Sequence, residues 1–272
     1  MTFEAFFLPT GTGQRFCLLH PVASGVRVRG AVVYVHPFAE EMNKTRRMAA
    51  LQARALASAG YAALQIDLRG CGDSAGDFGE ASWQDWIDDV LLACAWLRQW
   101  NEARNEAALW LWGLRAGCLV AAEAARRNAA VDGLLFWQPT LSGKQQLQQF
   151  LRLKSVGDGL ADREDEMSMK RLKAELARGN PVEIAGYTLS PELANGLENA
   201  ELGLPERAVR VEWLEVSATA GLSPLAVNQL EKWRAQGHAA RGAAVRGPAF
   251  WQTTEIAENP ELLAATLTAL KQ

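Results

Sequence analysis

The chain has 272 residues, of which 49% are hydrophobic and 22% are charged, and its net charge is −3 at pH 7. These values are typical of soluble globular domains and exclude a chain that is disordered along most of its length. Basic and acidic residues are interspersed, so the sequence lacks the basic footprint of a nucleic-acid-binding protein. At this length, one elaborated α/β domain is a better expectation than two separate domains.

Membrane, secretion and metal signals are all missing from the sequence. The longest apolar run, residues 90–97, falls far short of the ~18 residues that span a bilayer. The first residues lack the basic and apolar regions of a secretory signal, so we expect a cytoplasmic protein. Its four widely spaced cysteines are then expected to be reduced. The three histidines lack metal-ligand spacing, and neither a metal nor another cofactor is expected.

Strands and helices alternate along the first half of the chain. An apolar segment, a glycine-rich turn and a second strand predict a hairpin over residues 3–20. The following strands are expected at residues 30–35, 61–68, 108–112 and 131–137, and the helices between them at 43–59, 83–100 and 115–128. This alternation implies right-handed crossovers and a parallel sheet that helices cover on both faces.

The alternation breaks between residues 141 and 205, which are polar and variable in period. Helices are expected there at 145–154, 166–178 and 191–199 and a short β excursion at 181–189, whereas the stretch between the first two helices stays unassigned. Strands at 210–216 and 239–245 and helices at 224–234 and 261–270 then restore the alternation. We therefore predict a core of residues 1–140 and 206–272, with a cap inserted at residues 141–205.

Short motifs accompany this order of elements. They are YVHPF at 34–38, DLRGCGDS at 67–74, HPFAEEMNK at 36–44, FWQP at 136–139, QFLRL at 149–153 and GPAFWQT at 247–253. With the element order, the first two resemble the α/β hydrolase superfamily, and the others resemble the hydrolase 2 family associated with the exosortase A system. The resemblance implies an α/β hydrolase fold, hydrolysis of esters or thioesters, and a role in exopolysaccharide production or protein sorting.

The nucleophile elbow is the first place to test that chemistry. A serine hydrolase of this fold needs G-x-S-x-G between a strand and a helix, because small flanking residues permit the strained turn. Gly113 and Gly117 have this spacing, but Arg115 occupies the serine position. Arginine stays protonated in proteins and is not a nucleophile.

The other two triad positions also lack the expected residue types. The loop expected to carry the acid, residues 217–223, has no carboxylate, and the variant acid position holds Gln138. No histidine occurs at 246–251, and His238 precedes the last strand, at the opposite end of the sheet. A Ser-His-Asp mechanism is therefore not predicted. The backbone N–H groups of Phe38 and Ala116 occupy the oxyanion-hole positions, where they can still bind an anion or a carbonyl.

Arg115 requires an anionic partner. It is expected at the start of a helix, where the macrodipole disfavours a cation by ~0.3–1 kcal/mol, and beneath the cap, where an unpaired charge is costly. One interpretation is an internal ion pair with Glu40 or Glu41. The other is a bidentate contact with a ligand carboxylate or phosphate. The two interpretations do not exclude each other.

Four further residues near the predicted strand ends have two interpretations each, and a fifth has one. His36 is a weak candidate for a general base, and the structural alternative is a ring bonded to backbone or to Glu40. Ser142 is a candidate nucleophile or simply a loop serine, and Cys118 is expected in the core. Trp137 and Trp251 could form a flat wall for a sugar ring or acyl chain, or could fill a vacated active site.

Three functions remain open from the sequence. The first is an ester or thioester hydrolase that works through unconventional residues around His36 and Glu41. The second is a non-catalytic member of the family that binds an acidic or acyl small molecule or a partner protein. The third is an acyltransferase, which the same pocket could support but which also needs a nucleophile or an activating base.

Overall fold

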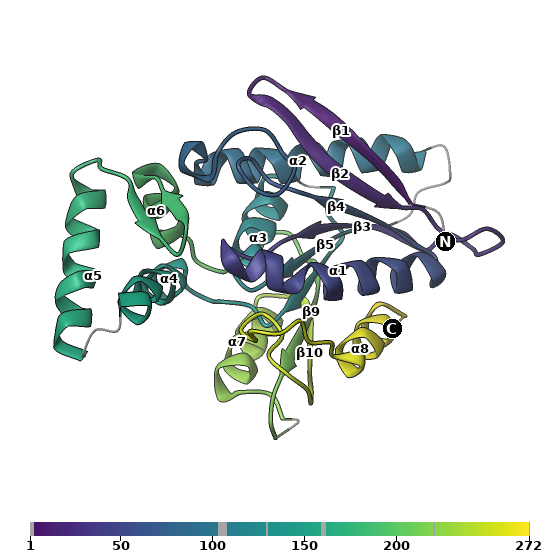
Figure 1. Ribbon diagram of the computed structural model, residues 1–272. Coiled ribbons are helices and arrows are strands. Elements are labelled where there is room, and N and C mark those ends of the chain that lie inside the picture. The colour runs from purple at the N-terminus through teal and green to yellow at the C-terminus, as the bar shows by residue number, and fades with distance from the viewer. Residues whose placement is uncertain (1–2, 103–107, 129, 159–161, 220, 272) are drawn as a thin grey trace.

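The computed structural model describes residues 3–102, 108–128, 130–158, 162–219 and 221–271 (Figure 1). Its main sheet has the strand order β1-β2-β4-β3-β5-β6-β9-β10. The strands are β1 (Glu4–Thr10), β2 (Gly13–His20), β3 (Gly30–Val35), β4 (Tyr61–Ile66), β5 (Ala108–Leu114), β6 (Gly133–Trp137), β9 (Arg210–Val216) and β10 (Ala239–Val245). β2 is antiparallel to β1 and to β4, and all other neighbours are parallel. The predicted α/β hydrolase fold is confirmed.

Helices cover both faces of the sheet. On one face, α1 (Glu40–Ser58) packs on β4 and against α8 (Pro260–Lys271). On the other, α2 (Trp83–Glu102) packs against α3 (Gly117–Arg127), and α7 (Pro224–Ala235) packs on β10. Every residue of β3 is buried, as a strand between two helical layers requires. The sheet divides the buried apolar side chains into two clusters, one on each face.

The segment between β6 and β9 lies beyond one end of the sheet (Figure 1). It consists of α4 (Gly143–Asp158), α5 (Asp162–Ala177), the hairpin of β7 (Val182–Ile184) and β8 (Tyr187–Leu189), and α6 (Pro191–Glu198). We call these elements the cap. The expected β excursion is this hairpin, whose turn has a positive φ at Ala185 and Gly186. Residues 159–161, part of the stretch left unassigned from sequence, lie outside the described residues.

Two predicted helix starts differ from the structure. The helix expected from residue 43 begins at Glu40, because two acidic side chains in its first turn favour the positive end of the helix dipole. The helix expected from residue 115 begins at Gly117, because β5 continues to Leu114 and Arg115 forms a turn. A short 3₁₀ helix, η1 (Phe78–Glu80), lies within the glycine-rich loop after β4.

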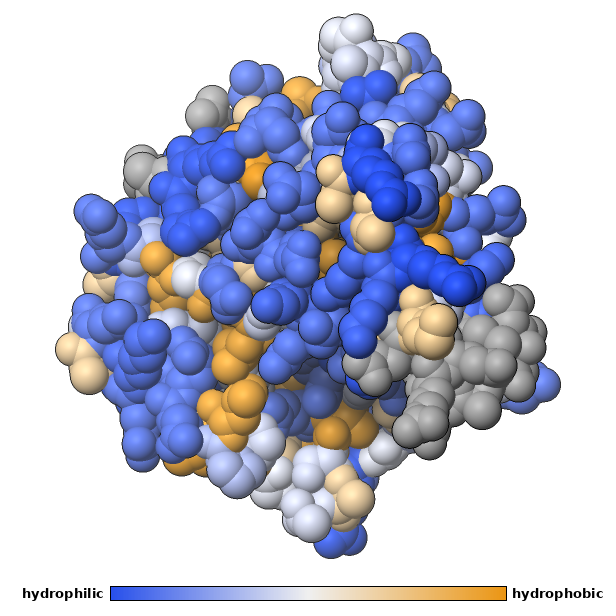
Figure 2. Space-filling model, turned by 90° about the vertical axis from the view of Figure 1, so that its left-hand side faces the viewer, coloured by the Kyte–Doolittle hydropathy of each residue, from blue (hydrophilic) through white to orange (hydrophobic). Residues whose placement is uncertain are grey.

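The outer surface of the cap end is predominantly hydrophilic. Figure 2 shows this face, where hydrophobic side chains form only small separate groups among polar ones. Scattered apolar groups of this kind are usual on protein surfaces. Within the described part of the chain, no helix has both the length and the apolar content to cross a bilayer.

Candidate functional site

The turn between β5 and α3 brings the strand, the helix and the loop after β3 into close contact. Arg115 has a φ of 55°, in the left-handed region that L-residues rarely occupy. A Cβ at Gly113 would lie 2.6 Å from Cα of Cys118, and a Cβ at Gly117 would lie 2.4 Å from the carbonyl oxygen of Val35. Only glycine fits at both positions, so the chain retains the tight geometry of a nucleophile elbow with arginine at its centre.

Arg115 is 9% exposed, and its side chain has partners from two other elements. Its Nε donates to Oε1 of Glu41, at the start of α1, over 3.3 Å. Its Nη2 donates to Oε1 of Gln146 (3.3 Å) and of Gln149 (3.0 Å), both on α4 of the cap. The guanidinium also lies 5.8 Å from the ring centre of Trp251. The arginine therefore links the elbow, α1 and the cap.

Of the two glutamates expected as partners of Arg115, Glu41 and not Glu40 forms the ion pair. Consecutive helical residues point about 100° apart, which explains why only one of the two carboxylates reaches the guanidinium. Burial raises the pKa of Glu41, and the neighbouring Arg115 opposes this rise. Burial also raises the pKa of Glu40. Oε2 of each carboxylate is buried without a hydrogen-bond partner, so this corner has acceptor capacity that the described residues do not use.

Both ring nitrogens of His36 are bonded to the backbone. Nδ1 lies 2.8 Å from the carbonyl oxygen of Pro37, and Nε2 accepts the N–H of Leu68 over 3.3 Å. These partners assign the proton to Nδ1 and leave Nε2 as an acceptor. Burial lowers the pKa of the ring, which favours the neutral form. The geometry favours the structural interpretation of His36, with Leu68 rather than Glu40 as the second partner.

Three residues considered for the triad make other contacts: Gln138 at the acid position, His238 as the histidine and Ser142 as an alternative nucleophile. Gln138 has a φ of 43°, and its side-chain oxygen accepts the N–H of Val216, which joins the ends of β6 and β9. Ser142 donates to Oε1 of Glu201 over 3.1 Å at the cap boundary. His238 lies next to the first residues of β9 and β10, at the far end of the sheet from Arg115.

The two amides expected in an oxyanion hole have no internal partner. Phe38 precedes α1, and Ala116 precedes α3 directly after the elbow residue. Neither N–H donates a hydrogen bond to any residue that the structure describes. Buried amides are normally paired, so these two remain available to a ligand oxygen.

The two tryptophans near the strand ends differ in their contacts. Trp251 is 4% exposed and lies beside the Arg115 guanidinium, and its buried Nε1 has no partner among the described residues. Trp137 has no exposed surface, and its Nε1 donates to Oγ1 of Thr266 on α8 over 2.9 Å. Trp137 therefore packs under α8 and forms no wall of the Arg115 site. Cys118 is buried, as expected of a core residue.

Sequence reasoning missed Gln146 and Gln149. Their spacing of three residues places them on one face of α4. The pattern alone could have shown a shared face, but it could not have shown that this face turns toward the elbow.

Residues 26–201 match the family model described as serine aminopeptidase, S33, which is more than half of the chain. No curated protein matches the sequence. Among solved structures, a highly thermostable carboxyl esterase from Bacillus coagulans in complex with glycerol is 14% identical, with a TM-score of 0.64 over 100% of this chain and 98% of the esterase.

Two further structures share the fold at low identity. A soluble variant of monoglyceride lipase from Saccharomyces cerevisiae is 16% identical, with a TM-score of 0.63 over 99% of this chain and 94% of the lipase. A thioesterase domain from the curacin biosynthetic pathway is 14% identical, with a TM-score of 0.55 over 100% of both chains. These structural similarities show the shared fold, and the family match shows that the chain belongs to the serine aminopeptidase S33 family of α/β hydrolases.

Proposed function

We propose that this member of the family is a binding protein without triad chemistry, and that its elbow holds the carbonyl or carboxylate of an acyl or acidic small molecule. The observation that carries the proposal is Arg115, which occupies the strained elbow position and is bonded to Glu41 and to two glutamines of the cap. An arginine at this position binds oxygen atoms and does not attack them.

The surrounding groups support binding more than turnover. His36 has no free ring nitrogen, Gln138 is neutral, and residues 217–219 and 221–223 contain no carboxylate. The amides of Phe38 and Ala116 can donate hydrogen bonds to a ligand oxygen at the elbow. The resemblance to exosortase-associated hydrolases extends the proposal to a ligand or protein partner in exopolysaccharide production or protein sorting.

Glu41 determines how an acidic ligand fits the site. An ionised Glu41 already neutralises Arg115, so a second carboxylate would meet an occupied cation. The raised pKa of Glu41 allows the ligand's charge to draw a proton onto this carboxyl group. Carboxylate binding should therefore tighten as the pH falls toward the ordinary range of a glutamate, as long as the ligand stays ionised.

A second candidate is hydrolysis of esters or thioesters with Glu41 as the base. The unpaired Oε2 of Glu41 and its raised pKa favour this candidate, as does the similarity of the fold to an esterase, a lipase and a thioesterase. In this mechanism, Glu41 takes a proton from a water molecule while the water oxygen adds to the carbonyl carbon. The amides of Phe38 and Ala116 stabilise the resulting oxyanion. The oxyanion then re-forms the carbonyl and breaks the bond to the alcohol or thiol, which leaves with the proton from Glu41 as the carboxylic acid is released.

One pair of assays separates these functions. Turnover of p-nitrophenyl acetate and of acetyl-coenzyme A is measured for the unmodified protein, Glu41→Gln and His36→Ala, and decanoate binding is measured by calorimetry. The binding proposal expects blank-level turnover in all three proteins and decanoate binding that Arg115→Gln weakens. Turnover that Glu41→Gln abolishes would establish the second candidate instead. Turnover lost only in His36→Ala would overturn both assignments.

A further inference from the structure

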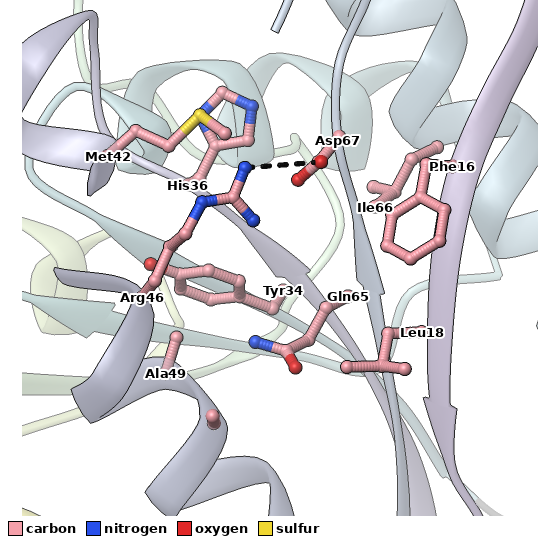
Figure 3. Close-up of a pocket in the computed structure, with 11 residues that line it drawn as sticks. Phe16, Leu18, Tyr34, His36, Met42, Arg46, Ala49, Gln65, Ile66 and Asp67 are labelled. Atoms are coloured by element: carbon pink, nitrogen blue, oxygen red, sulfur yellow. Dashed lines mark hydrogen bonds and ion pairs between the residues drawn. The ribbon is translucent and has the colours of Figure 1, made fainter. Parts of the chain in front are cut away.

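A separate cavity lies on the other side of α1 from the Arg115 site, between this helix and strands β2, β3 and β4. Its volume is about 170 Å³. Phe16 and Leu18 of β2 and Tyr34 of β3 provide apolar walls. Figure 3 shows the rings of Phe16 and Tyr34 on opposite sides of the space, with Leu18 at its lower end. The cavity is the size of one that holds a benzene molecule, ~150 Å³.

Arg46 supplies the polar end of this cavity. Its side chain extends from α1 toward Asp67, and its Nη2 donates to Oδ2 of Asp67 over 3.3 Å (Figure 3). The same Oδ2 also accepts the backbone N–H of Asp73. Nε and Nη1 of Arg46 take no part in the Asp67 bond, and the Arg46 side chain is 46% exposed. Donor capacity therefore remains at the mouth of the cavity.

His36 also borders the cavity, but it offers a ligand little hydrogen-bonding capacity. Both of its ring nitrogens are bonded to the backbone of Pro37 and Leu68. The bond from Asp73 and the ion pair with Arg46 partly satisfy Asp67, so a cationic ligand would compete with a cation already in place. The groups present therefore favour a ligand that accepts hydrogen bonds at one end and is apolar at the other.

We propose that this cavity binds a compact monocarboxylate whose apolar body is about the size of a benzene ring. The ring or short alkyl chain lies between Phe16, Leu18 and Tyr34, and the carboxylate receives hydrogen bonds from Arg46. Arginine suits this role because its guanidinium has five N–H donors, of which the bond to Asp67 uses one. The site is distinct from the elbow, whose arginine is bonded to Glu41 and the cap.

Calorimetric titration with benzoate and with benzyl alcohol tests this proposal. The two probes share a ring, but only benzoate is charged. We expect benzoate to bind with a Kd of about 1 mM or tighter, given the few atoms of such a ligand. Arg46→Gln should weaken benzoate binding about 10-fold and leave benzyl alcohol unchanged. Ala49→Leu, which fills the cavity from α1, should weaken both probes.

Arg47→Gln is the matched control, because Arg47 is the next residue of α1 but pairs with Glu258 outside the cavity. It should leave both titrations unchanged. Arg46→Gln removes an exposed side chain and so keeps the test available if Ala49→Leu does not fold. Equal benzoate affinity in the unmodified protein and Arg46→Gln would overturn the proposal, as would the absence of saturable benzoate binding. Displacement of benzoate by decanoate, which is too long for the cavity, would also overturn it.

Discussion

Arg46 belongs to α1, and Arg115 contacts the first turn of the same helix through Glu41. The two arginines differ in how completely the surrounding residues neutralise and hydrogen-bond the guanidinium. Arg115 is buried, with a carboxylate and two amide oxygens around its guanidinium. Arg46 is half exposed and makes one ion pair, with Asp67. A buried cation must be compensated within the fold, whereas an exposed one retains its capacity for a ligand. A ligand at Arg115 must therefore share the guanidinium with Glu41, whereas Arg46 keeps donors that a ligand can reach from solvent.

Replacing each arginine by methionine tests this difference most directly. Arg115→Met leaves the buried Glu41 carboxylate without its cation and should lower the free energy of unfolding by about 3–5 kcal/mol. Arg46→Met should cost about 0–1 kcal/mol, because Arg46 is half exposed. Urea unfolding measures both values, and adding Glu41→Met to Arg115→Met should restore most of the loss. Equal costs at the two positions would contradict the comparison.

His36, which lies between the two regions, should have the next largest effect. His36→Ala leaves the carbonyl of Pro37 and the amide of Leu68 unpaired and should cost about 1–3 kcal/mol in urea unfolding. His238→Ala is the matched comparison, because the His238 ring accepts one backbone bond over 3.4 Å. A larger loss for His238→Ala would show that the two bonds of His36 contribute little.

The pH dependence of stability gives a second readout for His36. Burial lowers the pKa of the folded-state ring below its ordinary value of 6.5, so the unfolded chain binds more protons at acidic pH. This contribution to stability is present above pH 6.5 and is lost as the pH falls through the folded-state pKa. His36→Ala should therefore flatten that part of the stability curve. If the free energy of unfolding of His36→Ala changes with pH as steeply as that of the unmodified protein, the lowered pKa of the His36 ring is contradicted.

The cap contacts of Arg115 should have smaller effects. Gln146 is buried and also accepts a hydrogen bond from Thr140, so Gln146→Leu should cost about 1 kcal/mol. Gln149 is exposed at its position on α4, and Gln149→Ala should cost less. Hydrogen exchange of the α4 amides measures whether the cap loosens. Equal protection in both variants and the unmodified protein would show that these bonds do not hold the cap.

The smallest effect expected is the pH response of Glu41, because Arg115 offsets the effect of burial. The pKa of Glu41 is raised above 4.5 in the folded state, so the folded protein holds this proton more tightly than the unfolded chain. The resulting stability is present below pH 4.5 and is lost as the pH rises through the folded-state pKa. The free energies of unfolding of the unmodified protein and of Glu41→Gln should therefore diverge as the pH rises above 4.5. A difference between the two that stays constant with pH would contradict the raised pKa.

The fold was predictable because its evidence is local. Continuous apolar strands such as Gly30–Val35, alternating with amphipathic helices, determine a covered parallel sheet. The position of Arg115 in the elbow followed from the two flanking glycines. Its need for an anion followed from burial and charge, but the choice between Glu40 and Glu41 depended on where α1 begins.

The rest of the site depends on contacts between distant segments. Gln146 and Gln149 reach Arg115 only because α4 folds over the end of the sheet, which no local pattern specifies. Trp137 could have been placed from strand alternation, since Leu135 and Trp137 share a face and both belong to the cluster under α1 and α8. Arg46 lies among apolar residues at helical spacing, a pattern that predicts a core face and gives no sign of a cavity.

The division of the apolar core by the sheet has a consequence for how this protein can diverge. The buried cap residues Leu147, Phe150, Ile184, Leu193 and Leu197 all belong to the cluster on the α2–α3 side. None of the described cap residues belongs to the cluster under α1 and α8. The cap can therefore change in evolution while one complete hydrophobic layer keeps its packing. Mutations that alter the cap and mutations that alter this layer should then have largely independent effects on stability.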